Sequence, residues 1–419
     1  MRIGIIGLGY VGLSTMLSFV KKGHEVIGVD KSNRVIDLLL EGVSPIQEPG
    51  IEELLKISRE FYTDYRFLND SEIIFVCVDT PTKSNNESDL TNLNACMEEL
   101  SKNIKENTII VIKSTCPVGT TRNLYNKFKI KHPHLNSRFA FNPEFLSQGT
   151  AVKNALKPNR IVLGVEDEDT KELLSNLYSS FMCPIVITDF ESAELAKYVC
   201  NSFLATKISF INEMANLADA TNANIDDIKK IMALDNRIGD IFLNPGVGYG
   251  GGCFIKDTRS LITQAESKSV KLNVLKGVDE TNNKQKNILL KNFYYYLGNF
   301  TSLREQDILI IGLAFKPNTG DVRGSIAYEN IQNLREYQPV IHVYDPLVDR
   351  TNPLFSDLIF ETDLKSAVNK CKYILIFSEK SEALLLDAED YRNKVIFDGR
   401  NLLNKHLTKY AKHYKGVGR

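Results

Sequence analysis

The chain has 419 residues, of which 43% are hydrophobic and 25% are charged, and its formal net charge is −1. This length exceeds what one hydrophobic core supports and predicts two or three domains. The near-zero charge and the lack of a long basic run argue against nucleic acid or an acidic lipid surface as a partner. No apolar run approaches the roughly 18 residues of a membrane span, so we expect a soluble globular protein.

Seven cysteines are scattered along the chain, at positions 77, 96, 116, 183, 200, 253 and 371. Their number is odd and they form no CxxC pair, which argues against a disulfide framework or a zinc knuckle. We therefore expect a reducing, cytoplasmic environment and no metal site. The opening MRIGIIGLGYVG is short and broken by glycine, and it lacks a cleavage site, so it predicts a strand rather than a signal peptide.

The first residues of the chain predict a dinucleotide-binding turn. A short apolar strand over 2–6 is followed at once by GLGYVG (7–12) and an apolar-periodic helix. In such a turn Gly7 makes the tight bend and Gly9 lets a pyrophosphate approach the backbone. Gly12 allows the helix and the strand to pack closely.

The groups around this turn favour NAD. The start of the helix, at Tyr10 and Val11, offers N–H groups and a partial positive charge to the phosphates. A second strand ends in Asp30, which is placed to bond both ribose hydroxyls and to repel a 2′-phosphate. NAD is therefore expected over NADP, a preference that the nearby Lys31 and Arg34 soften.

Hydrophobic runs that alternate with helical stretches predict a parallel, doubly wound sheet in this region. Further strands are predicted at 73–78, 108–115, 138–142 and 160–165. Ligands of such sheets bind at the carboxyl ends of the strands, which places Thr80, Pro81, Thr115 and residues 142–144 along one crevice. Two structural alternatives remain open: Thr115 as a helix N-cap, and Glu144 as an acid in the first turn of a helix.

A helix of about 30 residues without Gly or Pro is predicted from Glu191 onward. It is longer than usual globular helices, so we expect it to link domains and to pack against a second subunit. Lys197 and Asn201 are neighbours on one helical face, either as a functional pair or as two solvated polar residues. They lie beside an apolar stripe formed by Ala193, Ala196, Val199, Cys200 and Phe203.

The composition breaks near residue 300, and a third α/β region follows. Its strands are predicted at 307–315, 340–346, 373–378 and 395–401. The first turn of this region, 312–325, carries Lys316 and Arg323 where the first domain has glycines, and Arg400 lies at the same carboxyl edge. Cations in these places suit a phosphate, although a plain surface loop is the alternative. The region is therefore expected to bind a nucleotide substrate.

The pattern as a whole predicts two Rossmann-like doubly wound domains joined by a long central helix with a small helical domain. We expect an NAD-binding domain over 1–190, a helical linker and dimerisation domain over 191–297, and a domain over 298–419 that binds the nucleotide substrate.

Seven motifs, spread over essentially the whole length, resemble the UDP-glucose/GDP-mannose dehydrogenase family. They are GLGYVGL, KSTCPVGTT, FNPEFLSQGTAV, ELAKYVCNSFLATKISFINE, DNRIG, GYGGGCFIKD and GLAFKPNTGDVRGS. The resemblance implies a four-electron oxidation of the C6 alcohol of UDP-glucose to the carboxylate of UDP-glucuronate. It also implies two NAD⁺ per sugar and a homodimer or larger homo-oligomer.

The same resemblance implies roles for individual residues. Cys253 is the expected nucleophile, which forms a thiohemiacetal and then a thioester, and Lys197 with Asn201 stabilises the oxyanion. Asp257 and Thr115 hold water, and Glu144 is the acidic partner near the sugar. The substrate-binding set comprises Glu144, Lys197, Asn201, Arg237, Tyr249, Gly250, Lys316 and Arg400, with Arg237 reaching the substrate of the neighbouring subunit. The cofactor-binding set comprises Gly7, Gly9, Tyr10, Val11, Gly12, Asp30, Thr80, Pro81, Thr115, Gln148 and Lys256.

Local chemistry near Cys253 agrees with a nucleophile. Glycines at 248 and 250–252 let the backbone pass close to a sugar and adopt positive φ. Lys256 and the helix start that follows favour the thiolate.

The chain departs from the family pattern at two positions. Gln148 stands where the family has a second acid, and an amide hydrogen-bonds but takes up no proton. Gly324 replaces the acid of an RES motif, which puts the local loop geometry in question.

Three other functions remain open. The same chemistry could act on GDP-mannose or a UDP-N-acetylhexosamine. A noncatalytic NAD-sensing protein would share the scaffold, and a two-electron hydroxyacid dehydrogenase would share the first domain but need no thiol.

Overall fold

The computed structural model describes residues 1–298 and 302–419. These form two compact units, one of residues 1–200 with 266–268 and the other of residues 201–265 with 269–419. Residues 299–301, at the predicted break before the third domain, lie outside the described residues. Each unit contains its own sheet and its own hydrophobic cores.

The first unit contains an eight-stranded sheet in the order β3-β2-β1-β4-β5-β6-β7-β8. Its strands are β1 (Arg2–Ile6), β2 (Glu25–Val29), β3 (Phe61–Tyr62), β4 (Ile73–Val76), β5 (Ile109–Ile112), β6 (Arg138–Phe141), β7 (Ile161–Gly164) and β8 (Ile185–Thr188). The strands from β3 to β6 are parallel, as the alternating pattern predicted.

The expectation of a wholly parallel sheet is wrong at one edge. β7 pairs antiparallel with β6 through Phe141 and Gly164, and β8 runs parallel to β7. Between β6 and β7 the only α-helix is α6 (Ala151–Leu156), six residues long. A helix of this length spans about 9 Å, so this connection lacks the longer helix that usually forms a parallel crossover.

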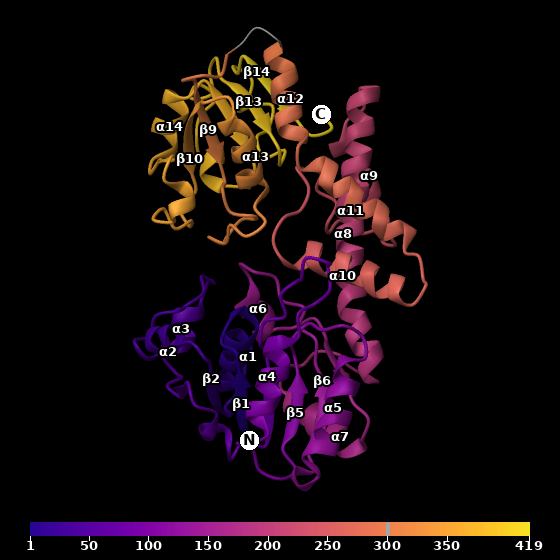
Figure 1. Ribbon diagram of the computed structural model, residues 1–419. Helices are drawn as coiled ribbons and strands as arrows, with labels where there is room; N and C mark the ends of the chain where they lie inside the picture. Colours follow the sequence, from indigo (N-terminus) through magenta and orange to yellow (C-terminus); the bar gives the residue numbers. More distant parts are fainter. Residues whose placement is uncertain (299–301) are drawn as a thin grey trace. The chain divides into compact units, whose positions relative to one another are not determined.

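The helices of this unit lie on both faces of the sheet (Figure 1). They are α1 (Tyr10–Lys21), α2 (Asn33–Leu40), α3 (Ile51–Leu55), α4 (Thr91–Leu100), α5 (Thr120–Lys131), α6 and α7 (Glu168–Ser179). Ile73 and Phe75 of β4 enter one core, whereas Ile74 and Val76 enter the other, because successive side chains of a strand point to opposite faces. Burial on both faces explains why the predicted strands read as continuous apolar runs.

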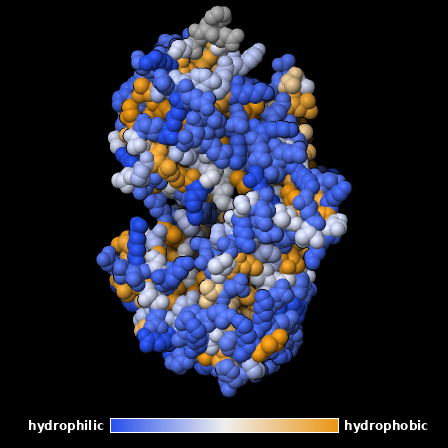
Figure 2. Space-filling model, in the orientation of Figure 1, coloured by the Kyte–Doolittle hydropathy of each residue, from blue (hydrophilic) through white to orange (hydrophobic). Residues whose placement is uncertain are grey.

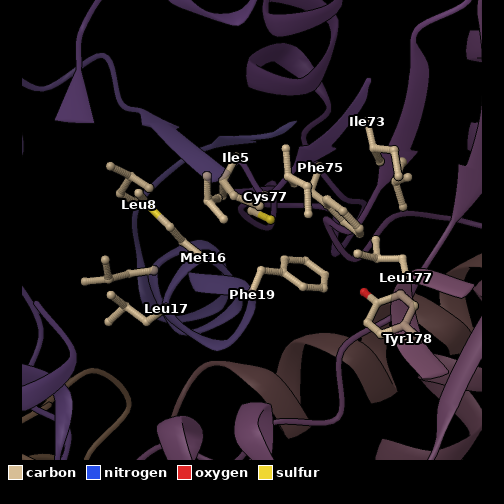
Figure 3. Packing of buried hydrophobic residues seen from close by; sticks show 14 of the residues in the cluster. Ile5, Leu8, Met16, Leu17, Phe19, Ile73, Phe75, Cys77, Leu177 and Tyr178 are labelled. Carbon is tan, nitrogen blue, oxygen red and sulfur yellow. The ribbon is translucent and has the colours of Figure 1, made fainter. Parts of the chain in front are cut away.

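Aromatic packing joins α1 to the sheet and to α7. The ring of Phe19 lies 5.2 Å from that of Phe75 and 5.5 Å from that of Tyr178, centroid to centroid. Figure 3 shows Phe19 pointing toward these two rings, with Cys77 close by.

The long helix is α8 (Phe190–Thr221), with 32 residues, and its predicted start at Glu191 is correct to one residue. Asp189 caps it, because its Oδ1 accepts a hydrogen bond from the backbone N–H of Ser192 at 2.7 Å. The helices that follow are α9 (Ile225–Ala233), α10 (Cys253–Ser267), α11 (Asn273–Gln285) and α12 (Ile288–Leu297).

The second unit contains a six-stranded sheet in the order β11-β10-β9-β12-β13-β14, in which every pair is parallel. Its strands are β9 (Asp307–Ile311), β10 (Val340–Tyr344), β11 (Ile359–Phe360), β12 (Tyr373–Ile376), β13 (Val395–Asp398) and β14 (His413–Gly416). The helices α13 (Ile326–Arg335) and α14 (Leu364–Lys370) pack beside it. This order matches that of the first six strands of the other sheet, so the predicted repeat of the N-terminal design is confirmed.

Among the described residues, no helix combines the length and hydropathy needed to cross a membrane. Polar residues cover most of the face seen in Figure 2, and hydrophobic residues appear there in small groups.

Candidate active site

The glycine turn after β1 has the geometry of a dinucleotide cradle. Gly7 has φ +88°, and a Cβ there would lie 2.7 Å from the Cys77 carbonyl oxygen. A Cβ on Gly12 would lie 1.7 Å from the Gly7 carbonyl oxygen, so this position admits only glycine. Gly9 differs, because a Cβ there would meet no atom within 4 Å. The space that a pyrophosphate needs therefore lies over Gly9, at the N-cap of α1 and beside Tyr10 and Val11, where no side chain caps the helix.

Asp30 follows β2 and completes this cradle. Its Oδ2 accepts from the Leu8 backbone N–H at 2.8 Å and its Oδ1 accepts from that of Ser32 at 2.9 Å. The residue is only half-buried, so its carboxylate is held in place and still reaches the surface. This arrangement fits the ribose of NAD.

Thr80 and Thr115 lie together after neighbouring strands. The hydroxyl of Thr80 donates to the Thr115 carbonyl oxygen at 2.6 Å, and Pro81 beside it is exposed. The alternative role of Thr115 as a helix N-cap is wrong, because α5 begins at Thr120 with Gly119 at its N-cap.

Glu144 and Lys197 form a buried ion pair in the first unit, with Nζ 2.7 Å from Oε1. The other carboxylate oxygen accepts from the Leu146 backbone N–H at 2.6 Å. Burial disfavours the ionised form of Glu144, but the Lys197 ammonium, this N–H and the more distant Lys113 together hold its pKa below the ordinary value. Glu144 lies seven residues before α6, so the first-turn alternative is wrong as well.

Gln148 is partly buried in the same loop. The backbone N–H groups of Gly149 and Ala151, which follow it, donate to the buried Glu48 carboxylate at 2.5 and 2.9 Å. Glu48 therefore fixes the end of this loop and the start of α6.

In the second unit Asp257 is fully buried and has two partners. Nδ2 of Asn201 donates to its Oδ2 at 2.7 Å, and Nζ of Lys256 lies 3.0 Å from its Oδ1. Lys197 and Asn201 are one turn apart on α8, and each contacts a different carboxylate. Both are buried, so the alternative of two solvated polar residues is wrong.

Cys253 is exposed and is the first residue of α10. Asp257 lies one helical turn after it in the same helix. The positive end of a helix dipole favours an anion, so this position suits a thiolate.

The glycine run before Cys253 packs against the turn that contains Gly324. Gly251 has φ +78° and donates its N–H to the Gly324 carbonyl oxygen at 3.1 Å. A Cβ on Gly250 would lie 2.3 Å from that same oxygen. Gly324 itself has φ +61°, and a Cβ there would lie 3.1 Å from both the N and the O of Gly251. The departure at Gly324 thus coincides with a backbone conformation and a close contact that favour glycine.

The predicted substrate cations lie in loops that follow strands of the C-terminal sheet, Lys316 after β9 and Arg400 after β13. Arg400 donates from Nε to the Phe377 carbonyl oxygen at 2.8 Å and from Nη1 to that of Gly248 at 3.4 Å. Lys316 is half-buried, with Nζ 5.5 Å from the centroid of the Phe315 ring.

The other two predicted substrate residues have different surroundings. The backbone N–H of Tyr249 donates to the Asn282 side chain at 2.9 Å, and burial raises the pKa of Tyr249 to about 12. Arg237 is on an exposed turn, and its guanidinium binds Asp235.

The acid at the end of β10 shows how the two sheets differ. Asp345 accepts from the backbone N–H groups of Leu313 and Ala314, both at 2.9 Å, and from Nζ of Lys380 at 2.7 Å. Asp345 is buried, whereas the equivalent Asp30 is only half-buried. The acid of the second sheet is therefore a structural ion pair and not a ribose ligand.

Two buried polar residues escaped the sequence reasoning. Glu194 of α8 accepts from the backbone N–H groups of Gly119 and Thr121 at 2.6 and 2.7 Å, which fixes the segment after Thr115. Lys113 directly follows β5 and is buried. The sequence signal for Lys113 was its position directly after the apolar run IIVI. No sequence pattern pointed to Glu194.

Three family models match successive parts of the chain. They are the NAD binding domain (residues 1–182), the central domain (191–284) and the UDP binding domain (309–405) of UDP-glucose/GDP-mannose dehydrogenases. The chain belongs to the UDP-glucose/GDP-mannose dehydrogenase family. It is 36% identical to a UDP-glucose 6-dehydrogenase of Bacillus subtilis, over 100% of this chain and 98% of the relative, and 33% identical to one of Rhizobium meliloti over 100% of both.

Solved structures of this family have the same fold. A UDP-glucose dehydrogenase of Pyrobaculum islandicum is 31% identical and superposes with a TM-score of 0.92, over 100% of this chain and 97% of that one. A UDP-D-ManNAc dehydrogenase of Pyrococcus horikoshii is 27% identical with a TM-score of 0.88, over 100% and 99%.

As a member of the UDP-glucose/GDP-mannose dehydrogenase family, the protein is an NAD-dependent oxidoreductase with a UDP-sugar as its substrate. The predicted cofactor is confirmed, and the cradle around Gly9 lies in the NAD binding domain. Lys316 and Arg400 lie in the UDP binding domain, and Cys253 lies in the central domain.

Proposed function

We propose that the protein oxidises the C6 alcohol of UDP-glucose to the carboxylate of UDP-glucuronate, with Cys253 as a covalent nucleophile. One arrangement carries this proposal: an exposed cysteine at the start of α10, one turn before a buried carboxylate that Asn201 and Lys256 hold. A single oxidation of an alcohol needs no thiol. A thiol assists the oxidation of an aldehyde to an acid, because it binds the carbonyl carbon covalently while a second hydride leaves.

NAD supplies the hydride acceptor for each of the two oxidations. The Cys253 thiolate adds to C6 of the aldehyde and forms a C–S bond. The product is a thiohemiacetal, and its C6 again carries a hydrogen that can leave as a hydride. Loss of that hydride and of the hydroxyl proton leaves a thioester on Cys253. Water then adds to the thioester carbon, and cleavage of the C–S bond returns the thiolate and releases the acid.

The surrounding side chains have separate tasks in this scheme. Lys197 stabilises negative charge on the C6 oxygen, together with Asn201, and Glu144 keeps the Lys197 ammonium in place. One preorganised donor of this kind is worth about 3 kcal/mol in the transition state. Asp257 orients the attacking water, with Thr115 as a second contact. Gln148 takes up no proton, so we assign acid–base chemistry near the sugar to Glu144 alone.

Substrate binding is assigned to Lys316 and Arg400, with Tyr249 and Gly250 beside the sugar. The hydrogen bond from Arg400 to the Gly248 carbonyl supports this, because it joins a cation of the sheet edge to the glycine run before Cys253. Two cations suit a diphosphate, which carries its charge on several oxygens.

We also propose a homodimer formed through α8. Leu195, Val199, Phe203, Phe210 and Leu217 are exposed, and their spacing of four and seven residues places them on one face of this helix. Of the predicted apolar stripe, Ala193 is buried within the chain, whereas Val199 and Phe203 are exposed, by 48% and 62%, and belong to this face. The exposed turn of Arg237 is suited to reach the substrate of the partner.

The yield of NADH per sugar tests the reaction. UDP-glucose should give two NADH and one UDP-glucuronate, whereas a two-electron enzyme would give one NADH and an NAD sensor none. The same assay with GDP-mannose and UDP-N-acetylmannosamine tests substrate choice. A higher kcat/KM for GDP-mannose or UDP-N-acetylmannosamine than for UDP-glucose would reject UDP-glucose as the substrate. It would not reject the covalent chemistry.

A further inference from the structure

The segment of residues 246–249 is buried although it belongs to no helix or strand. Its last residue, Tyr249, lies four positions before Cys253, where α10 begins. A buried backbone needs hydrogen-bond partners for its N–H and C=O groups, and an irregular segment lacks the regular ladder of a sheet or helix. The partners of this segment therefore come from other parts of the second unit.

The side chain of Asn282, on α11, pairs with both backbone groups of Tyr249. Its Oδ1 accepts from the Tyr249 N–H at 2.9 Å, and its Nδ2 donates to the Tyr249 carbonyl oxygen at 3.0 Å. A carboxamide makes this pair because it carries an acceptor and a donor side by side. Gly248 leaves room for it, since φ is +89° there and a Cβ would lie 2.6 Å from Oδ1 of Asn282. The buried amide of Asn282 thus fixes one end of the segment.

A second buried amide, that of Gln285, fixes the other end. Its Nε2 donates to the Gly246 carbonyl oxygen at 2.7 Å, and its Oε1 accepts from Nδ2 of Asn216 at 2.9 Å. The Gly246 N–H donates to Oδ1 of Asn212 at 2.8 Å. Asn282 and Gln285 are three residues apart, which places them on the same face of α11. One face of this helix therefore holds both ends of the segment.

Three glycines, 250–252, connect this segment to Cys253. Because glycine restricts the backbone little, these residues alone do not fix where α10 begins. The Tyr249 backbone supplies one fixed point, and the hydrogen bond from Gly251 to Gly324 supplies another. The thiol depends on this placement, since the favourable effect of the helix dipole on an anion is confined to the first turn.

We propose that Asn282 and Gln285 are positioning residues for Cys253: their amides fix the backbone of residues 246–249, and with it the place where α10 begins. This inference rests on the role proposed for Cys253 above. Loss of either amide contact should lower the reactivity of the thiol and kcat. Binding of NAD should not change, because the NAD binding domain belongs to the other unit.

Asn282→Asp and Gln285→Glu test this by changing one group each. A protonated carboxyl keeps a donor and an acceptor, whereas an ionised carboxylate has no donor for the backbone carbonyl. Both variants should therefore lose their hold on the segment as the pH rises. Asn283→Asp is the matched control, because Asn283 is exposed on the same helix and its side chain bonds to Arg259 and Asp279.

Alkylation by iodoacetamide without substrate, measured on the peptide that contains Cys253, reports the environment of the thiol. The rate in each variant is divided by that of the unmodified protein at the same pH. In Asn282→Asp we expect this ratio to be near one at pH 5 and to fall about two- to fivefold by pH 8, the factor that a lost helix-dipole interaction gives. Gln285→Glu should fall in the same direction, and Asn283→Asp should stay near one. The buried Cys371 in the same samples should remain unmodified, which excludes global unfolding.

Steady-state kinetics supply a second readout. In Asn282→Asp, kcat at pH 8 should fall by about 10- to 100-fold, because a small displacement of a catalytic group can cost this much. The KM for NAD should be unchanged. A purely structural role would instead lower the yield of folded protein and leave kcat per folded molecule the same.

A flat alkylation ratio in Asn282→Asp or in Gln285→Glu overturns the proposal, and so does an equal fall in Asn283→Asp. If one of the two variants does not fold, the other decides by the same ratio. The expected ratios together with a yield other than two NADH per sugar in the unmodified protein would keep this positioning and reject the proposed function. Flat ratios with two NADH per sugar would reject the positioning and keep the function.

Discussion

The side-chain amide of Asn201 donates a 2.7 Å hydrogen bond to the buried carboxylate of Asp257. This bond joins the middle of α8 to the first turns of α10, where Cys253 is the first residue. It holds the carboxylate that we assign to the hydrolytic step in one orientation relative to the cysteine of the same helix.

Asp257→Asn should slow hydrolysis of the thioester while the nucleophile stays intact. Mixed with UDP-glucose and NAD⁺ and quenched in acid, this variant should carry a uronyl-nucleotide adduct on the peptide containing Cys253, as measured by mass spectrometry. Cys253→Ala is the matched control: it should bind both nucleotides, form no adduct and lose acid production by several orders of magnitude. An adduct on another residue, or full acid production by the control, would reject the covalent mechanism.

Asp30→Ser should increase the use of NADP, because it removes the carboxylate that opposes a 2′-phosphate. The unmodified protein should prefer NAD clearly in kcat/KM. Since the Leu8 and Ser32 N–H groups lose their acceptor, a modest fall in activity with NAD is also expected. Equal kcat/KM for both cofactors before any substitution would refute the role of Asp30.

Lys316→Ala should raise the KM for the UDP-sugar and leave that for NAD nearly unchanged. Arg400→Ala should do the same and also lower kcat, because Arg400 bonds to the carbonyl of Gly248 in the glycine run before Cys253. Steady-state kinetics with each nucleotide varied in turn measure both effects. A loss of NAD affinity in either variant would show that these cations do not belong to the sugar site.

Gly324→Ala should destabilise the protein by about 1–2 kcal/mol, the usual cost of a Cβ in the left-handed region. It should also reduce kcat, because the new methyl group presses on Gly251, two residues before Cys253. Gly42→Ala is the control: it has φ +81° and open space around a Cβ, so it carries the same strain without the contact. Equal kcat in the two variants would argue that the Gly324 contact has no effect on the cysteine.

Glu144→Gln should cost about 3–5 kcal/mol of stability at pH 7, because it leaves the buried Lys197 ammonium without its counter-ion. The pKa of Glu144 in the folded protein is below its ordinary value of 4.5. Its stabilising contribution is therefore complete above pH 4.5 and is lost as the pH falls through the lowered value. Denaturant unfolding at pH 7 and at lower pH should show the difference between variant and unmodified protein shrinking in acid, and a constant difference would contradict this.

The parts of this protein that were predictable depend on neighbours in the chain. Gly7, Gly9 and Gly12 were recognisable because a tight turn, a close ligand and a helix crossing each impose a local requirement on one residue. The two sheets were predictable because strands buried on both faces must be apolar throughout. The start of α8 at Phe190 was predicted to within one residue because an uninterrupted helical pattern begins there.

Contacts between distant residues were decided by the tertiary structure alone. The helical pattern places Lys197 and Asn201 on the same face and does not distinguish them. In the structure Lys197 binds Glu144, 53 residues away in the chain, and Asn201 binds Asp257, 56 residues away. Asp30 follows β2 in the first sheet, and Asp345 follows the corresponding strand β10 in the second sheet. Of these two acids, Asp345 is the one paired with a buried lysine. The reversed direction of β7 and the enclosure of Lys113 also depend on how segments pack. Whether a side chain is buried or paired depends on all the groups that surround it in space. The order of residues along the chain does not specify which distant groups those are.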